Sequence, residues 1–299
     1  MNVNYEYYRI FYYVCKYHSF TKAANVLCSN QPNITRAMNR LEEQLGCKLL
    51  VRSNQGITLT PEGKTLYFHV EIAQNQLQAA EDELAGNAGL QNGTITVGAS
   101  ETALNVFLLD KLQMFRQRYP DIRMRIVSHS TPQAIAALSR GLVDLIVIST
   151  PSKIEKAMRE TMLASFQEVL IAGPNLRDLA DKPHHLAELQ QYPLICLGPD
   201  TMTYAFYNQL YLKHGLVLQP DTEPASADQI LPLVKSGLGL GFVPLDFVRD
   251  ALSRQEVFEV PLYETISLRQ ISLVRDKRRA PSVAAHAFEQ MLLEGVRMD

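Results

Sequence analysis

The chain has 299 residues, of which 46% are hydrophobic and 20% charged. The length is about twice that of a typical domain, and the composition excludes a disordered, collagen-like or purely coiled-coil chain. No apolar run approaches the roughly 18 residues that a membrane-spanning helix needs, and the first residues lack the basic and apolar segments of a signal peptide. We therefore expect two or more globular domains, in the cytoplasm, with no membrane partner.

The net charge of −2 hides an uneven distribution along the chain. Residues 1–65 have eight Lys and Arg against four acidic residues, whereas residues 66–89 have four acidic residues and no basic one. A basic segment in an otherwise weakly acidic chain predicts a polyanionic partner for the N-terminal segment alone.

Candidates for catalysis, metal binding or a disulfide framework are weak. The four cysteines contain no CxxC pair, and we expect buried, reduced thiols. The pair His184-His185 cannot chelate a metal from one helix face and is expected in a surface loop. The sequence contains no GxSxG, P-loop or HExxH motif, so it predicts no catalytic residue, no metal site and no cofactor. The cysteines are Cys15, Cys28, Cys47 and Cys196.

The first section of the chain predicts three helices. Apolar residues at three- and four-residue steps between Tyr7 and Cys15 form one helix face. Ser19 can cap a second helix over residues 20–28, and Asn30 can cap a third that has proline in its first turn and ends at Gly46. Short helices joined by a tight turn predict a helix-turn-helix.

The third helix has a basic, amide-rich face, and its acidic residues are confined to the C-terminal end. Arginine pairs with guanine, and asparagine or glutamine with adenine, in the major groove of DNA. Residues 48–52 and 57–60 flank a turn and predict a hairpin that forms a wing. The residues of the face are Gln31, Asn33, Thr35, Arg36, Asn39 and Arg40.

A second section opens with a helix start at Thr60-Pro61-Glu62. Apolar residues then recur in alternating steps of four and three, which is a heptad seam. The alternative is a helix packed against its own domain, but no compact partner lies nearby in sequence, so we expect self-association. Glycines between residues 86 and 93 predict a hinge. The seam consists of Leu66, Val70, Ala73, Leu77, Ala80 and Leu84.

From residue 94 onward, strand-like runs alternate with helical stretches, a pattern typical of a parallel α/β sheet. Residues 266–274 and 282–296 are expected to return to the first half. The pattern predicts two α/β lobes enclosing a cleft, where strand ends and helix N-termini meet a small ligand. The expected strands cover residues 95–97, 122–127, 145–148, 169–172, 194–197, 217–218 and 240–243.

Several of these motifs resemble the LysR-type transcriptional regulators. The DNA-binding domain of that family is similar to the run 19–24, to Gln31-Pro32, and to the positions Arg36, 41–42, 45–46, 49, 52 and 59–63. Its effector domain is similar to residues 137–145 and 233–244. Asn30 and Asn33 depart from the serine and alanine usual beside Gln-Pro, and Leu50 departs from the usual aromatic residue, which leaves room for a different operator preference.

The resemblance implies an N-terminal all-α winged helix-turn-helix at 1–60, a long linker helix for dimerisation at 61–89, and a C-terminal two-lobed α/β effector domain, similar to periplasmic binding proteins, at 90–299. Lobe I would hold residues 94–163 and 266–299, and lobe II residues 164–265. Such a regulator binds an interrupted inverted repeat in double-stranded DNA and responds to a small-molecule effector. It dimerises through its linker helix and is usually tetrameric through its effector domains, and RNA polymerase is a candidate partner.

The resemblance also assigns DNA contacts. Base edges would meet Gln31, Pro32, Thr35 and Arg36, and the DNA backbone would meet Thr21, Lys22 and Arg52; a solvated surface lysine is the alternative for Lys22. Phosphate contacts fix the register of a protein on DNA and base contacts specify the sequence. Asn30, Asn33 and Arg40 complete the candidate set.

The candidate effector residues are hydroxyls where strands end and helices begin, since backbone N–H groups there favour an anion. For each residue alone, a helix cap without ligand contact is the alternative. We expect a small anionic effector. The candidates are Ser100, Thr102, Ser130, Thr131, Ser149, Thr201 and Thr203, with Phe242 beneath them.

Two other classes of protein share some of these features. A free solute-binding protein has two lobes but would need an export signal and would not need residues 1–89. A redox-sensing regulator of the same family would need two effector-domain thiols, and only Cys196 lies there, which excludes a disulfide switch within one chain. A DNA-binding regulator, not an enzyme, is the favoured function.

Overall fold

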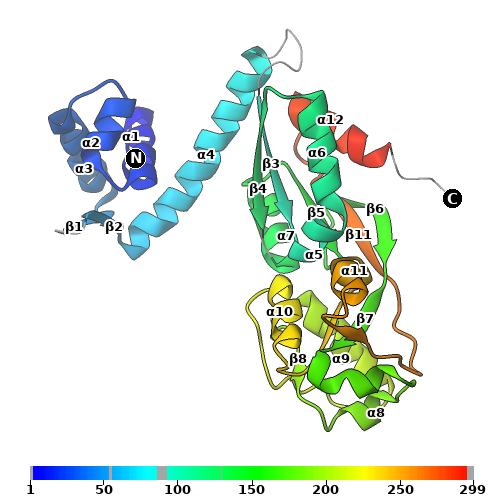
Figure 1. Cartoon of the computed structure of the whole chain (residues 1–299). Coiled ribbons are helices and arrows are strands. Elements are labelled where there is room, and N and C mark those ends of the chain that lie inside the picture. The colour runs from blue at the N-terminus through cyan, green and yellow to red at the C-terminus, as the bar shows by residue number, and fades with distance from the viewer. Residues whose placement is uncertain (1–2, 54–55, 86–92, 129, 295–299) are drawn as a thin grey trace. The chain divides into compact units, whose positions relative to one another are not determined.

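The structure is a computed structural model that describes residues 3–53, 56–85, 93–128 and 130–294. The chain divides into two compact units, Met1–Leu84 and Ala85–Asp299, which Figure 1 shows from blue to red along the chain. Each unit has its own buried core, as expected for domains that fold independently.

The first unit is a winged helix-turn-helix followed by a long helix. Ser19 accepts a hydrogen bond from Lys22 N, and Asn30 accepts one from Asn33 N, so both predicted caps are confirmed. Gly46 ends the third helix with a left-handed φ of 70°, a conformation that glycine adopts without strain. The elements are α1 (Tyr5–Tyr17), α2 (Phe20–Val26), α3 (Gln31–Leu45), β1 (Leu50–Ser53), β2 (Gly56–Leu59) and α4 (Pro61–Ala85).

Glu42 ties α3 to the hairpin. The sequence suggests an exposed acid at the end of the polar face, but the residue is buried. Its Oε1 accepts hydrogen bonds from the backbone N–H groups of Leu49, at 2.9 Å, and Leu50, at 3.2 Å, and its Oε2 lies 2.6 Å from Lys48 Nζ. A buried carboxylate is tolerated here because its charge is paired and hydrogen-bonded.

The heptad seam of α4 divides into two parts. Val70 is only 8% exposed in the core of the unit, and Leu66 packs against the same core. The ring of Tyr67 stacks on Tyr12 with centroids 6.1 Å apart. The first part of the seam therefore packs within its own unit, which corrects the expectation for Leu66 and Val70. Ala73, Leu77 and Ala80 are exposed, and the side chain of Leu84 lies outside the described ones.

Lobe I of the second unit contains a mixed sheet with strand order β4-β3-β5-β11-β6. The expected parallel pairing is found between β3 and its two neighbours, β4 and β5. In contrast, β11 runs antiparallel to both β5 and β6. The strand that returns from lobe II enters in the opposite direction, which is why the sheet is mixed. The bounds are β3 (Gly93–Ala99), β4 (Ile122–Ser128), β5 (Leu145–Ser149), β6 (Met158–Phe166), β11 (Arg269–Asp276), α5 (Glu101–Ala103), a π-helical turn (Leu104–Leu108), α6 (Leu109–Arg118), α7 (Thr131–Arg140) and α12 (Val283–Leu293).

Helices cover both faces of this sheet (Figure 1). Along the buried strand β5, Leu145 and Val147 join the core shared with α6 and α12, whereas Ile146 and Ile148 join the core beneath α7. Alternate side chains of a strand point to opposite faces. The apolar strand β5 therefore packs into two cores, which fix the position of its C-terminal end.

Lobe II has a second mixed sheet, in the order β10-β7-β9-β8. The strand expected at 217–218 is not formed: Val217 is 61% exposed, and only an isolated bridge joins Thr222 to Ile195. The bounds are β7 (Glu168–Ala172), β8 (Leu194–Ile195), β9 (Leu240–Pro244), β10 (Phe258–Glu259), 3-10 segments at Pro174–Ala180 and Ala227–Gln229, α8 (Leu186–Leu189), α9 (Met202–Lys213), α10 (Ile230–Lys235) and α11 (Leu245–Ser253).

The cysteines and the histidine pair depart in part from expectation. Cys15 and Cys196 are buried, and burial raises the pKa of each thiol to about 12. Cys28, however, is exposed just after α2 and has a φ of 49°. His184 is buried, and its backbone N–H donates to Pro261 O, whereas His185 is exposed as expected.

Among the described residues, no group of three or more His, Cys, Asp and Glu is placed to hold a metal ion. Nor is any described helix long and apolar enough to cross a membrane.

Candidate functional sites

The polar face of α3 is presented to solvent because the opposite face is in the core. Ile34, Met38 and Leu41 are buried, so an amphipathic helix turns its other residues outward. The structure exposes Gln31, Pro32, Asn33 and Arg36, together with Asn30, Thr21 and Lys22, while Thr35 is half-buried.

Two other candidates on this unit are placed differently. Arg40 is exposed at the C-terminal half of α3, but its Nη1 donates a hydrogen bond to the hydroxyl of Tyr7 in α1, at 3.3 Å. That contact holds the guanidinium against its own domain. Arg52 lies in β1 with its backbone opposite Ile57, and its side chain lies outside the described ones.

A cavity of about 310 Å³ lies between the two lobes of the second unit. Its lining brings together seven of the eight candidate effector residues, five from lobe I and two from lobe II. Chain order alone therefore anticipates the chemistry of the cleft floor. The seven are Ser100, Thr102, Ser130, Thr131, Ser149, Thr201 and Thr203.

The lining hydroxyls are already engaged with their own chain. Ser100 Oγ caps α5 by accepting from Ala103 N, at 3.3 Å, and it also accepts from Ser149 N, at 3.1 Å. Thr201 Oγ1 accepts from Tyr204 N and donates to Gly198 O. Each of these hydroxyls thus caps a helix and lines the cavity at the same time.

Phe242 does not lie beneath the cavity. It belongs to β9, is buried, and stacks on Tyr207 with ring centroids 4.5 Å apart, in the core of lobe II. It lines neither wall of the cleft. The expectation for this residue is therefore wrong: on the strand it occupies, its side chain points to the α8–α9 face and not to the other lobe.

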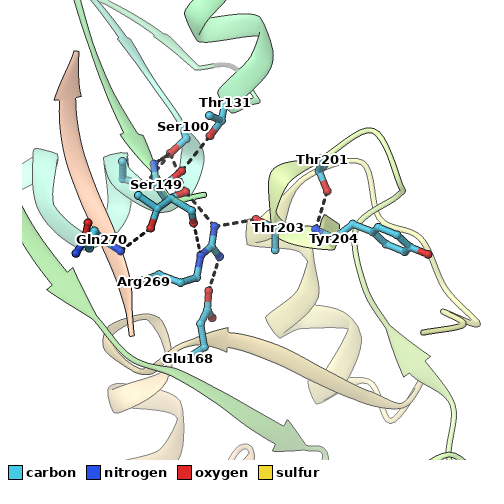
Figure 2. A network of polar contacts seen from close by, with 11 residues as sticks. Ser100, Thr131, Ser149, Glu168, Thr201, Thr203, Tyr204, Arg269 and Gln270 are labelled. Carbon is cyan, nitrogen blue, oxygen red and sulfur yellow. Dashed lines mark hydrogen bonds and ion pairs between the residues drawn. The ribbon is translucent and has the colours of Figure 1, made fainter. Parts of the chain in front are cut away.

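Arg269, at the start of β11, is the residue that the sequence interpretation missed. Its side chain is 1% exposed and makes polar contacts with four residues (Figure 2). Nη1 lies 2.6 Å from Glu168 Oε1, and Nε donates to Thr150 O at 2.7 Å. Nη2 donates to Ser149 Oγ, at 3.2 Å, and to Thr203 Oγ1, at 3.3 Å.

Aromatic rings enclose the same guanidinium. Its central carbon lies 5.4 Å from the ring centroid of Phe166 and 5.1 Å from that of Phe206, which are distances of cation–π contacts. Arg269 stands where a strand returns to lobe I, and Glu168 stands where another leaves it. The sequence signal that could have identified the pair is that two residues of opposite charge lie where the chain passes from one lobe to the other.

Among the described residues, the charged side chains that line the cleft are both acidic, Glu101 and Asp200. Burial raises the pKa of Glu101, and nearby Asp228 raises it further against the opposing hydrogen bond from the backbone N–H of Ala227. That N–H donates to Glu101 Oε2 at 2.8 Å and so links lobe II to lobe I. The described part of the lining therefore offers hydroxyl and backbone donors but no basic side chain.

Comparisons with known proteins agree with this geometry. The model of the bacterial regulatory helix-turn-helix protein, lysR family, matches residues 5–64, and that of the LysR substrate binding domain matches residues 88–297. The uncharacterised HTH-type transcriptional regulator YnfL of Escherichia coli K12 is 29% identical over 310 residues, covering 99% of this chain and 100% of that protein. The RuBisCO operon transcriptional regulator of Allochromatium vinosum is 23% identical, covering 100% and 98%.

Solved structures show the same fold. Full-length CbnR complexed with its target DNA is 19% identical and superposes with a TM-score of 0.74, covering 98% of this chain and 100% of that one. With a helix-turn-helix at one end, a two-lobed domain at the other and both family models matched in order, the chain belongs to the LysR-type transcriptional regulators, which bind DNA and are modulated by small-molecule effectors.

Proposed function

We propose that this regulator takes a small anionic effector in the cleft between lobes I and II and passes that event to a DNA-bound dimer or tetramer. The carrying observation is that nine hydroxyl residues from both lobes, seven of them predicted candidates, line one cavity of about 310 Å³. Such a concave site with a few convergent polar groups is typical of small-molecule recognition. We assign it no catalytic role and no cofactor.

The DNA side of the proposal rests on the exposed face of α3. Gln31, Pro32, Thr35 and Arg36 would meet base edges of an interrupted inverted repeat, with Asn30 and Asn33 beside them. Thr21, Lys22 and Arg52 would meet phosphates. The relative solved with its target DNA supports this use of the fold.

Self-association rests on the distal part of α4. Ala73, Leu77 and Ala80 recur at heptad steps, and all three are exposed in the single chain. The exposed fraction of Leu77 is 43%. A second copy of the helix would bury this stripe as a coiled-coil seam. RNA polymerase, in the cytoplasm, would be the partner through which the bound regulator changes transcription.

The test replaces two cleft hydroxyls, Ser100→Ala with Thr131→Val, and measures transcription from a reporter in response to an effector found by a thermal-shift screen of organic acids. We expect the response to be lost in the double variant. Ser253→Ala is the matched control, since that hydroxyl is exposed on α11 and contacts only Asp250 O. A wild-type response in the double variant would place the effector elsewhere.

A further inference from the structure

Lobe II contains a second cavity, of about 710 Å³, which we call the lobe II cavity. Its walls come from β7, β8, β9, α8, α9 and the segment 217–221. Among the described residues, none lines both this cavity and the cleft. A volume of this size is typical of small-molecule sites, and the position of the cavity within one lobe separates it from the cleft.

One face of the lobe II sheet forms the apolar floor of this cavity. Leu194 in β8 is paired with Leu240 in β9. Leu170 in β7 is paired with Phe242, two residues further along β9. Paired residues, and residues two positions apart on a strand, point to the same face of a sheet, so the three leucines that line the cavity share one face. This part of the wall offers a ligand apolar contacts.

A tyrosine hydroxyl in this wall has no hydrogen-bond partner among the described residues. It belongs to Tyr211 in α9, which lines the lobe II cavity and is only 6% exposed. Burial raises the pKa of this hydroxyl to about 12, so it keeps its proton at neutral pH. Buried tyrosine hydroxyls usually have a hydrogen-bond partner. A ligand in the cavity can supply one.

The exposed lining residues form the mouth of the cavity. Gln190 Nε2 donates a hydrogen bond to Val217 O, at 3.3 Å. Asp221 Oδ2 accepts one from Leu194 N, at 2.8 Å, so the segment 217–221 is held at both of its ends. Asp221 is the one charged residue of the described lining, and no basic side chain in the described part of the chain pairs with it. The mouth therefore has a negative charge that a cation can balance.

We infer that the lobe II cavity is a second ligand site, which takes an ammonium compound with an apolar, ring-containing body. The ammonium group lies at Asp221 in the mouth, where the two opposite charges attract, and the body lies against the leucine floor. A ring that has an N–H or O–H group also gives the Tyr211 hydroxyl a hydrogen-bond partner. A carboxylate of the same shape is repelled by Asp221. The site goes beyond the proposed function, because its position and the charge of its ligand both differ from those of the cleft.

The experiment measures dissociation constants of the full-length protein for three probes that share an indole ring: tryptamine, tryptophol and indole-3-propionate. The chain contains no tryptophan, so the fluorescence of the indole reports binding directly. We expect tryptamine to bind about fivefold more tightly than the uncharged tryptophol, the factor for an ion pair at an exposed site. Indole-3-propionate should bind more weakly than tryptophol.

Two substitutions in the mouth test the position of the ammonium group. Asp221→Asn keeps an acceptor for Leu194 N but removes the charge, and Val217→Lys adds a positive charge to the mouth. Each should reduce the affinity for tryptamine to that for tryptophol, and both residues are exposed, so both variants should fold. Leu212→Lys is the matched control, because it adds the same charge at a residue that is 59% exposed and lies outside the lining. It should leave the preference for tryptamine unchanged.

The cleft is the alternative location for tryptamine, because acidic residues line it as well. Asp200→Asn removes one of those charges and should leave the affinity for tryptamine unchanged. The inference is overturned if tryptamine does not bind, if tryptophol or indole-3-propionate binds as tightly, or if Asp221→Asn keeps the wild-type preference. It is also overturned if Asp200→Asn lowers the affinity for tryptamine as much as Asp221→Asn does, or if Leu212→Lys lowers it as much as Val217→Lys does.

Discussion

The reading face of α3 and the floor of the cleft both consist of short polar side chains, but they differ in what those side chains already contact. On α3, Gln31, Asn33 and Arg36 extend into solvent from a helix whose other face is buried. In the cleft, Ser100, Ser149 and Thr203 are held by caps and by Arg269. The side chains of the first surface are exposed, whereas those of the second are held in place by hydrogen bonds within the chain.

The largest effect should come from breaking the buried support of the cleft. Arg269→Met leaves Glu168 charged and buried without its partner, and we expect the second unit to lose about 3–5 kcal/mol of unfolding free energy. Urea unfolding of the variant measures the loss. Arg249→Met is the control, because Arg249 pairs with Asp246 at the surface, where an ion pair contributes at most about 1 kcal/mol. Equal losses of unfolding free energy in the two variants would mean that the buried ion pair contributes no more than the surface one.

The distal seam of α4 should respond next. Leu77→Glu would place like charges opposite each other in an apolar seam and remove the burial of a leucine in each chain, at a cost of about 2 kcal/mol or more to the dimer. Analytical ultracentrifugation measures the change in self-association. Gln76→Glu adds the same charge beside the seam and should leave the association unchanged. An unaltered oligomeric state in Leu77→Glu would mean that the seam does not pair chains.

The reading face should show effects on DNA without effects on folding. Arg36→Ala should weaken operator binding by about 1–3 kcal/mol and leave binding to random DNA nearly unchanged, as for a base-directed arginine. Lys22→Ala should weaken both to the same extent, since a phosphate contact carries no sequence information. Fluorescence anisotropy with the two DNAs separates these outcomes. A uniform loss in Arg36→Ala would assign that residue to the phosphates.

The smallest effect concerns Glu42, whose carboxylate is hydrogen-bonded within the DNA-binding unit. Burial raises its pKa, but Lys48 and the backbone N–H groups of Leu49 and Leu50 more than offset this, so the pKa lies below its ordinary value of 4.5. The stabilisation is therefore complete above that value and is lost as the pH falls through the lowered pKa. Glu42→Gln should cost about 1 kcal/mol at neutral pH and flatten this acid dependence. Thermal unfolding between acid and neutral pH measures it, with the exposed neighbour Glu43→Gln as control.

The difference between the two surfaces also explains what could be predicted. The caps at Ser19, Asn30 and Ser100 and the outward face of α3 depend on residues within a few positions of each other. Periodicity and capping rules operate at that range. Seven of the nine described hydroxyl residues that line the cleft could be predicted because they lie where strands end and helices begin.

What could not be predicted depends on contacts between distant residues. Arg269 meets Ser149 and Glu168 across more than a hundred positions of sequence, and a charged residue is expected at the surface until its partner is known. The prediction for Phe242 is wrong because a run of apolar residues does not say which face of a sheet each side chain meets. The antiparallel entry of β11 follows from the path of the chain through lobe II and not from its own residues.

The burial of Leu66 and Val70 in the core of the first unit has a geometric consequence for a pair of chains joined through α4. The first turns of that helix and α3 belong to one rigid body, so α4 acts as a fixed arm whose pairing point sets the distance between two reading helices. Each residue moves that point by about 1.5 Å along the helix axis, against about 3.4 Å for each base pair of DNA. If two chains pair through the exposed stripe that begins at Ala73, the length of α4 before that stripe contributes to the distance between their two α3 helices.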